Sequence, residues 1–334
     1  MRFALSPEQR DFADSLRKMC DAAGTPRIIR AWSGGDHRGG RGLIRQLAGA
    51  GALGLAVDED HGGMGAEAID LVVALQELGR AAVPGPLVET AAVIPTLLQA
   101  LPDTALARRW LPAFAEGQAL GTIALSPDAP AVDADTAEVV LVADGDRLSV
   151  GHRADHVRSV DAARRLFTVV ADDVVAEGDT VRVAIDAAFD AGALAAAAQI
   201  LGAGRTLLET SVAYVKQRHQ FGKPIGQYQA IKHHLANALI GLEMAEPLLY
   251  RAALSLDSPD RARDLSAAKL ACADAAYRTA RIALQVHGAI GYTAEFDLSL
   301  WLTKVTALRS AWGTAEFHRA RVGAALREET GSRV

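Results

Sequence analysis

The sequence is poor in cysteine and in long apolar runs, and both absences exclude classes of protein. Only two cysteines occur in 334 residues, Cys20 and Cys272, far apart in segments of helical pattern. They imply no disulfide framework and no Cys-x-x-Cys metal site, which suits a reducing compartment. The start of the chain lacks a charged-then-apolar signal pattern, and no run of about 18 apolar residues appears. We therefore expect no membrane segment and a cytoplasmic location.

The chain also lacks a net positive charge and is poor in aromatic residues. The formal net charge is −5, so no basic surface for nucleic acid is expected. Aromatic residues make up 5% of the chain and hydrophobic residues 50%, with alanine abundant, which favours closely packed helices around a large core. No phosphate loop and no G-x-G-x-x-G after a strand occurs, which argues against a Rossmann domain. His233 and His234 are adjacent on a predicted helix and cannot face one metal ion.

Hydrophobic periodicity predicts a mainly α fold with a small β domain. Residues 1–120 form a predicted N-terminal helical domain. Ser6-Pro-Glu-Gln9 is a capping box that starts a helix, 69–78 has helical spacing, and 32–40 is a Gly-rich loop. Residues 121–186 form a predicted β domain, with strands at 139–143, 147–150, 166–170 and 180–184. Residues 187–334 form a predicted four-helix bundle, with helices at 188–217, 227–256, 262–288 and 310–328.

The most informative segment is the turn between the first two helices of this bundle. It reads Arg218-His-Gln-Phe-Gly-Lys-Pro-Ile-Gly-Gln-Tyr-Gln-Ala-Ile-Lys-His-His-Leu235. Gly222, Pro224 and Gly226 fix the turn, because Gly and Pro end one helix and start another. An arginine with an aromatic residue three positions later can grip a phosphate and cover a planar ring. From these residues alone, a helix–helix turn with a surface arginine is the alternative.

This turn resembles the flavin-binding motif of the acyl-CoA dehydrogenases, R-x-Q-F-G-x-P-I-x-x-F-Q-A, with Tyr228 in place of Phe. Two further matches follow the family's order: residues 58–65 resemble P-E-E-Y-G-G-x-G, and residues 285–295 resemble Q-x-x-G-G-x-G-Y-x-x-E. The resemblance implies an acyl-CoA dehydrogenase-like fold, with a reduced middle domain, and FAD as cofactor. It also implies that the ADP half of FAD is held across a subunit interface by Arg218, Gln220, Phe221, Gln285, Gly288, Ala289 and Thr314.

The middle segment departs from the family pattern. Residues 122–133 stand where relatives carry T-E-P-x-x-G-S-D, a loop that embraces the flavin ring and the thioester. Ser126 can replace the Thr of that motif as a cofactor-binding residue, and Asp133 can replace its last Asp. The Glu and the small residues are lost, and no Trp occurs around 149–158. The alternative to a lost site is a divergent loop that still works.

The catalytic base of the family is missing as well. Relatives remove a proton α to the thioester with a Glu seventeen residues after the Glu of G-Y-x-x-E. Counting from Glu295 reaches Trp312, and Gly313-Thr314 confirms the alignment. A second position used by some relatives corresponds to Gly192, followed by Ala193. Indole accepts no proton and glycine has no side chain. Asp190, which we interpret as a helix-start residue, and Glu316 are the remaining candidates for a base.

The retained residues and the lost residues therefore serve different subunits. In this family the retained turn and the Q-x-x-G-G segment hold the flavin of a neighbour, whereas the lost residues serve a subunit's own ring and substrate. The resemblance narrows to the shortened subunit of actinobacterial α2β2 heterotetramers that act on steroid-derived acyl-CoA thioesters. It implies a full-length partner subunit that binds most of the acyl-CoA, and an electron-transfer flavoprotein as acceptor. The alternatives are a self-sufficient homomeric dehydrogenase and a flavin-free acyl-CoA-binding or scaffold protein.

Overall fold

The computed structural model describes residues 4–331, with side chains up to residue 328. It divides into two compact units. Here the N-terminal unit means residues 6–74 and 83–195, and the C-terminal unit means residues 75–82 together with the chain from residue 196 onward. Helices dominate, and a small sheet lies in the N-terminal unit, so the predicted mainly α fold is confirmed. The three predicted domains, 1–120, 121–186 and 187–334, stay a prediction.

Short helices make up most of the first 115 residues. The capping box at Ser6 is confirmed, since the Ser6 hydroxyl accepts from the Gln9 N–H at 3.2 Å and the Gln9 side chain accepts from the Ser6 N–H at 3.0 Å. The predicted loop 32–40 is shorter than expected, because Gly40 lies inside a helix; a Cβ there would come within 2.3 Å of the Trp32 ring. The elements are α1 (Pro7–Ala23), α2 (Thr25–Ser33), α3 (Arg38–Gly49), η1 (Glu59–His61), α4 (Ala68–Arg80), η2 (Glu89–Val93), α5 (Ile94–Gln99) and α6 (Ala105–Ala115).

The sheet has five strands in the order β1-β3-β4-β5-β2. They are β1 (Gly121–Ala124), β2 (Ala131–Val132), β3 (Val139–Asp144), β4 (Arg147–Val157) and β5 (Leu166–Glu177). Strands β1 and β3 pair in parallel and the other pairs are antiparallel. β3 is buried almost throughout, whereas most of β4 and β5 beyond residue 151 is exposed. The core of the sheet is therefore small, as expected for a reduced β segment.

The predicted strand at 180–184 is wrong. These residues form the first turns of α7 (Asp179–Gln217), which follows Gly178 directly. Val181, Ala184 and Ala188 are buried at helical spacing while Val183 is exposed, so the period of the burial pattern is that of a helix. Alternation over five residues is too short to separate the two periods.

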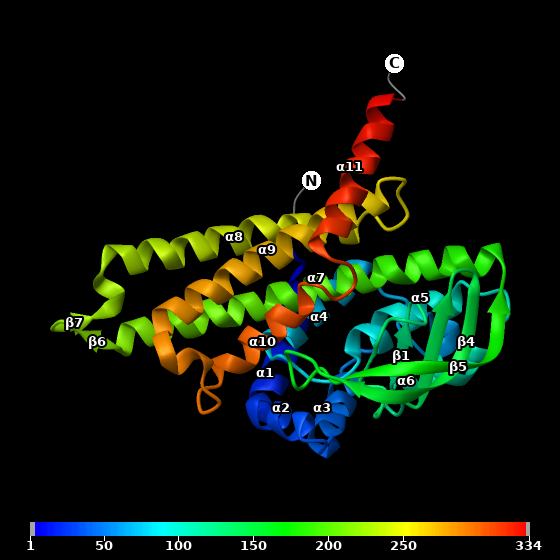
Figure 1. The fold of residues 1–334 in the computed structure, drawn as a ribbon, viewed down its shortest axis with the longest axis horizontal. Coiled ribbons are helices and arrows are strands. Elements are labelled where there is room, and N and C mark those ends of the chain that lie inside the picture. Colours follow the sequence, from blue (N-terminus) through cyan, green and yellow to red (C-terminus); the bar gives the residue numbers. More distant parts are fainter. Residues whose placement is uncertain (1–3, 332–334) are drawn as a thin grey trace. The chain divides into compact units, whose positions relative to one another are not determined.

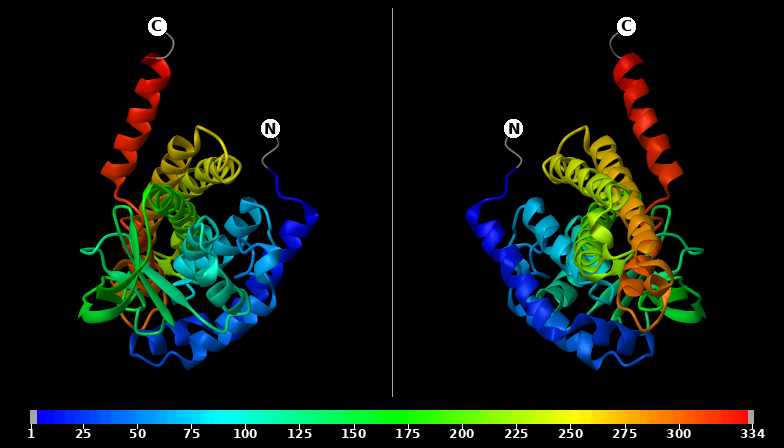
Figure 2. Two further views of the ribbon diagram at one scale, coloured as in Figure 1. Left: turned by 90° about the vertical axis from the view of Figure 1, so that its right-hand side faces the viewer. Right: turned by 90° about the vertical axis from the view of Figure 1, so that its left-hand side faces the viewer.

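The C-terminal unit packs long helices closely. It contains the end of α7, then β6 (His219–Gln220), β7 (Lys223–Pro224), η3 (Ile225–Gln227), α8 (Gln229–Ala253), α9 (Arg261–His287), η4 (Gly288–Tyr292), α10 (Leu298–Leu308) and α11 (Ala315–Gly331). Helices α8 and α9 run side by side in all views (Figures 1 and 2). At Gly204 of α7, a Cβ would meet Leu242 of α8 at 2.9 Å and Ala276 of α9 at 3.0 Å. The sequence prediction missed α10 and started the last helix five residues early.

Helix α7 is the one helix in the described chain that is long and apolar enough to cross a bilayer by length and composition. Its apolar window is 72% buried inside the protein, and its burial runs through nearly every residue from 188 to 203. Burial on all sides is the pattern of a core helix as much as of a membrane helix.

Candidate functional site

The predicted flavin-binding turn is a two-stranded hairpin. Strands β6 and β7 pair antiparallel, with His219 opposite Pro224 and Gln220 opposite Lys223. The two residues at the tip, Phe221 and Gly222, have φ values of 53° and 81°. A two-residue hairpin with both tip residues at positive φ is normal for Gly and costly for Phe. The Phe221 side chain is 92% exposed, so burial within the chain does not offset the free-energy cost of this backbone conformation.

The backbone of Arg218 is fixed while its side chain is exposed. Its N–H donates to the Tyr214 carbonyl at 2.9 Å, and its carbonyl accepts from the Ile225 N–H at 2.8 Å. The Tyr228 hydroxyl donates to the Gln220 carbonyl at 3.3 Å, so the change from the family's Phe adds a bond to the hairpin. The Lys223 ammonium lies 4.3 Å from the centre of the Tyr228 ring. Together these contacts fix the backbone that carries the exposed residues Arg218, Gln220 and Phe221.

The second predicted segment lies at the same end of the C-terminal unit as the hairpin. His287, at the end of α9, stacks on Tyr214 of α7 with ring centres 4.2 Å apart. Tyr214 is one helical turn before Arg218, so the two segments are neighbours. Gln285, Gly288 and Ala289 are exposed, as a ligand surface requires. Gly288 has φ 67° and ψ −146°, a conformation that is essentially restricted to glycine.

His287 packs between α7 and the end of α9, and it is not a candidate acid or base. Its Nδ1 donates to the Ala283 carbonyl at 2.8 Å, and the side chain is buried against Tyr214 and Phe296. Burial lowers the pKa of His287, and the bond to Ala283 opposes that shift only in part. The neutral ring is therefore a packing surface between α7 and α9.

Trp312 and Thr314 lie in the separate turn between α10 and α11. Trp312 has φ 58° and Gly313 has φ 102°. The Trp312 carbonyl accepts from His318 Nε2 at 2.9 Å. The Thr314 hydroxyl accepts from the Phe317 N–H at 3.2 Å and caps α11, and the residue is exposed. The predicted site residues of the C-terminal unit thus fall into two groups, one at the hairpin and one in this turn, while Ser126 belongs to the N-terminal unit.

The positions considered for a base differ in their surroundings. Gly192 and Ala193 are buried in the middle of α7 and offer no acid or base. The interpretation of Asp190 as a helix-start residue is wrong, because α7 begins at Asp179 and Asp190 is fully buried in its interior. Glu316 is exposed in the first turn of α11, where a carboxylate favours the free N–H groups.

The loop at residues 122–133, which departs from the family motif, is held in place at its C-terminal end. Ser126 is exposed, and its carbonyl accepts from the Ala129 N–H at 3.0 Å. Asp133 is fully buried with φ 49°; its carboxylate accepts from the Trp32 indole at 2.9 Å and its N–H donates to the Arg165 carbonyl at 2.6 Å. Asp133 is therefore an anchor of the fold, and sequence reasoning missed Trp32 as its partner.

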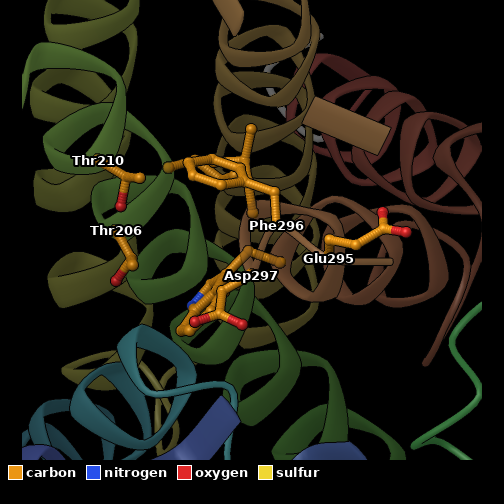
Figure 3. Close-up of a pocket in the computed structure, with 8 residues that line it drawn as sticks. Thr206, Thr210, Glu295, Phe296 and Asp297 are labelled. Atoms are coloured by element: carbon orange, nitrogen blue, oxygen red, sulfur yellow. The ribbon is translucent and has the colours of Figure 1, made fainter. Parts of the chain in front are cut away.

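A pocket of about 360 Å³ in the C-terminal unit was not expected (Figure 3). In Figure 3, Thr206 and Thr210 of α7 face Phe296 and Asp297, while the Glu295 carboxylate points away from them. Thr206 and Trp301 both donate to the Arg80 carbonyl at 2.7 Å. The ring centres of Phe296 and His287 lie 5.3 Å apart, so the pocket adjoins the end of α9. The lining residues are Thr206, Leu207, Thr210, Glu295, Phe296, Asp297, Leu298 and Trp301.

Metal and thiol chemistry find no support in the described part of the chain. No group of three or more His, Cys, Asp or Glu residues is placed to hold a metal ion among residues 4–331. Both cysteines are buried, and burial raises the pKa of Cys272 to about 12, so its thiol stays protonated and inert. The hairpin with its exposed arginine and aromatic side chain is therefore the best candidate for a ligand site.

The helical fold with a small sheet, and the exposed Arg–Phe hairpin beside the end of α9, agree with the resemblance drawn from the sequence. Family models agree: residues 6–118 match the acyl-CoA dehydrogenase N-terminal domain, and residues 181–327 match its C-terminal domain. The chain belongs to the acyl-CoA dehydrogenase family.

Individual relatives support this assignment. The chain is 32% identical to acyl-CoA dehydrogenase IpdE2 of Mycobacterium tuberculosis over 302 residues, which cover 89% of this chain and 91% of that protein. The ChsE4–ChsE5 complex from M. tuberculosis has the same fold, with a TM-score of 0.85, 21% identity, and coverage of 98% and 99%. A glutaryl-CoA dehydrogenase from Mycobacterium smegmatis, solved with FADH2, has a TM-score of 0.82, 20% identity, and coverage of 96% and 95%. The prediction of FAD as cofactor is thus confirmed at the level of the family.

Proposed function

We propose that this chain is the flavin-supporting, non-catalytic subunit of a heteromeric acyl-CoA dehydrogenase. Bound FAD supplies the hydride acceptor for α,β-desaturation of an acyl-CoA thioester. In this proposal the chain binds the ADP half of FAD across an interface, and a full-length partner contributes the reacting ring site. The observation that carries the proposal is the combination of a preserved, exposed Arg218–Phe221 hairpin with Trp312 at the position of the base.

The hairpin fits the ADP half of a flavin in charge and shape. The Arg218 side chain is exposed and its backbone is held on both sides, so it can give a charge-assisted bond to a pyrophosphate worth roughly 1.5–3 kcal/mol. Phe221 offers a flat apolar surface that no residue of the described chain buries. Gln285, Gly288 and Ala289 face solvent at the neighbouring helix end, with Gly288 allowing close approach to a ligand.

The reacting half of the site lacks the group that the chemistry requires. Removal of a weakly acidic proton needs a base within about 2.6–3.2 Å of it. Trp312 cannot accept a proton and Gly192 has no side chain. The α7 environment of Gly192 is also fully buried by the chain itself. Both facts favour binding and turnover of acyl-CoA mainly in the partner.

The exposed apolar face of α8 supports an assembly. Leu239, Ile240, Met244 and Leu248 are 43–70% exposed on this one helix. Apolar side chains gathered on one helix face mark protein interfaces more often than isolated ones do. We assign this face to contact with the partner subunit in an α2β2 heterotetramer.

We further propose a steroid-derived acyl-CoA as the substrate of the complex, an electron-transfer flavoprotein as the acceptor, and a cytoplasmic location. The solved Tcur3481–Tcur3483 steroid acyl-CoA dehydrogenase, which shares the fold with a TM-score of 0.86 and 23% identity, supports the choice of substrate. The ChsE4–ChsE5 complex supports a heteromeric assembly. Two alternatives predict different behaviour. A self-sufficient homomer would use Asp190 or Glu316 as base, and a flavin-free protein would bind or scaffold acyl-CoA without turnover.

Purification with and without the partner separates these functions. We expect the chain alone to be colourless and inactive, and the co-purified complex to be yellow and to turn over acyl-CoA. Yellow, active protein from the chain alone would establish the homomer, and colourless protein in both cases would establish the flavin-free alternative.

Arg218→Ala tests the flavin site itself. Loss of a charge-assisted bond should weaken FAD binding at least about tenfold, because tenfold corresponds to 1.4 kcal/mol. Lys216→Ala is the matched control, since it removes one positive charge from the same end of α7. Flavin content per complex, read from the absorption spectrum, is the measurement. Equal flavin content in Arg218→Ala and Lys216→Ala would refute the assignment.

A further inference from the structure

The short turn that carries Trp312 is fastened at both ends by buried side chains. It runs from Arg309 to Thr314 between α10 and α11 and contains two consecutive left-handed residues, Trp312 and Gly313. An L-residue such as Trp adopts this backbone region at a cost, so the turn needs contacts that hold it.

Lys269 of α9 holds the beginning of the turn. Its side chain is 1% exposed, and its ammonium donates to the Leu308 carbonyl at 2.8 Å and to the Arg309 carbonyl at 3.4 Å. These carbonyls end α10, where the helix dipole favours a cation. Burial of an ammonium group costs free energy unless acceptors such as these carbonyls bind it. The contact therefore restrains both the Lys269 side chain and the end of α10.

His318 of α11 holds the other end. It is 1% exposed, with Nε2 2.9 Å from the Trp312 carbonyl and Nδ1 3.1 Å from the Ser266 hydroxyl of α9. A ring nitrogen that faces a carbonyl must carry the proton, so Nε2 donates and Nδ1 accepts from Ser266. The Trp312 carbonyl therefore selects the tautomer with the proton on Nε2, and the Ser266 hydroxyl supplies the partner of Nδ1 and orients the ring.

Gly313 shows how closely the ring follows the turn. A Cβ at Gly313 would lie 2.5 Å from His318 Nε2 and 3.0 Å from Phe317 Cδ1. The imidazole thus lies against the backbone just after Trp312. Ser266 and Lys269 are three residues apart on α9, so one face of this helix supports both ends of the turn.

From this geometry we infer that His318 is a positioning residue that keeps the Trp312 indole in place, with Ser266 orienting it. The inference rests on the proposed function, in which Trp312 stands where relatives carry their base. A neutral hydrogen bond and the backbone strain of an L-residue are comparable in size, so loss of the His318 bond should release the turn.

The test uses three variants and the tryptophan signal. The chain has four tryptophans, and subtracting the fluorescence of Trp312→Phe in each background isolates Trp312. His318→Gln keeps one donor and one acceptor and should keep acrylamide quenching of Trp312 at the wild-type value. His318→Phe keeps the bulk without the donor and should raise quenching. Loss of one ordinary hydrogen bond shifts such a two-state equilibrium by roughly fivefold.

Ser266→Ala keeps the inference testable if the His318→Phe variant fails to fold. It removes only a hydroxyl and leaves the imidazole without its Nδ1 partner, so the ring is oriented less firmly and an intermediate rise in quenching is expected. Thermal unfolding of each variant provides the control for global stability. Wild-type quenching in both His318→Phe and Ser266→Ala overturns the inference, as does equal quenching in His318→Gln and His318→Phe.

Ligand counting separates this inference from the proposed function. In the complex with the partner, bound FAD and acyl-CoA per heterodimer are counted for wild type and His318→Phe. Increased quenching with unchanged ligand numbers supports His318 as a positioning residue and contradicts a closing role for Trp312. Increased quenching together with extra bound acyl-CoA supports both.

Discussion

At the scale of single residues, backbone strain coincides with positions predicted for the site. Among the described residues, four non-glycine residues have positive φ, and three of them are Asp133, Phe221 and Trp312. The sequence resemblance puts each of these three at a position of the family's flavin and substrate site. Strained residues persist where the surrounding contacts hold them, and they gather at functional sites. The strain at Asp133 and Trp312 is held by buried partners, whereas Phe221 is exposed.

Trp312→Glu tests whether Trp312 closes the site of this subunit. Wild-type complex should bind one FAD and one acyl-CoA per heterodimer, because an indole fills the space of the base and substrate carbon. Glu is smaller and restores a carboxylate, so added binding of acyl-CoA is expected, with stability lowered by about 1–3 kcal/mol.

Trp110→Glu is the matched control, since Trp110 is also partly buried and lies in the other unit. Isothermal titration and flavin absorbance give the ligand numbers. Two FAD and two acyl-CoA per heterodimer in wild type would show that the site was never closed.

At the scale of elements, the β6–β7 hairpin has a tip sequence that a structural role alone does not explain. Its tip is Phe-Gly at two positions of positive φ, where Asn-Gly is the usual choice. A protein that needed only a turn here would be more stable with Asn. The retention of a costly, exposed Phe is explained by a partner outside the chain, which the proposed flavin provides.

Phe221→Asn should therefore stabilise the chain and weaken the cofactor site. Asn tolerates the left-handed conformation, so the unfolding free energy should stay equal or rise by up to about 1 kcal/mol. FAD content of the complex should fall, because the flat apolar surface is lost. Thermal unfolding of the chain and flavin absorbance of the complex are the two measurements. A clear loss of thermal stability would instead identify Phe221 as a structural residue.

Sequence predicted those elements whose signal is local. The capping box at Ser6, the strands at 139–143, 147–150 and 166–170, and the helix around 69–78 were all confirmed. The helix start at Asp179 was missed because Thr180–Ala184 alternates like a strand and reveals its helical period only over Val181 to Ala188. Helix α10 was missed because its apolar residues show little periodicity.

The contacts that hold the site were beyond reach from sequence. Trp32 lies 101 residues from Asp133, and Ser266 lies 52 residues from His318. Such pairs follow from tertiary packing, which no local pattern encodes. The turn at 218–226 was recognised because Gly, Pro, Arg and Phe act through local geometry, yet the hairpin form and the left-handed Phe221 appeared only in the structure.

At the scale of the whole molecule, the chain keeps the helical parts of its family's fold around a small sheet, and its predicted set of site residues is incomplete. Residues 6–118 and 181–327 match the family's N- and C-terminal domains, whereas the sequence prediction puts Gly192 and Trp312 at the two positions where relatives carry a base. In the proposed function the helical core serves stability, and the exposed surfaces provide the contacts to flavin and partner. The apolar face of α8 and the hairpin tip are the exposed surfaces that a partner can use.

Met244→Glu tests the proposed partner surface. Met244 is 70% exposed on α8, so the free chain should fold with unchanged stability. In the complex, the new carboxylate would be buried without a partner, which should weaken association at least about tenfold, or 1.4 kcal/mol. Val183→Glu is the control, because Val183 is also an apolar residue, 60% exposed, and belongs to α7 in the N-terminal unit. Sedimentation velocity with increasing partner concentration measures the effect. If Met244→Glu and Val183→Glu assemble equally well, the α8 face is not the interface, and flavin sharing must use another surface of the C-terminal unit.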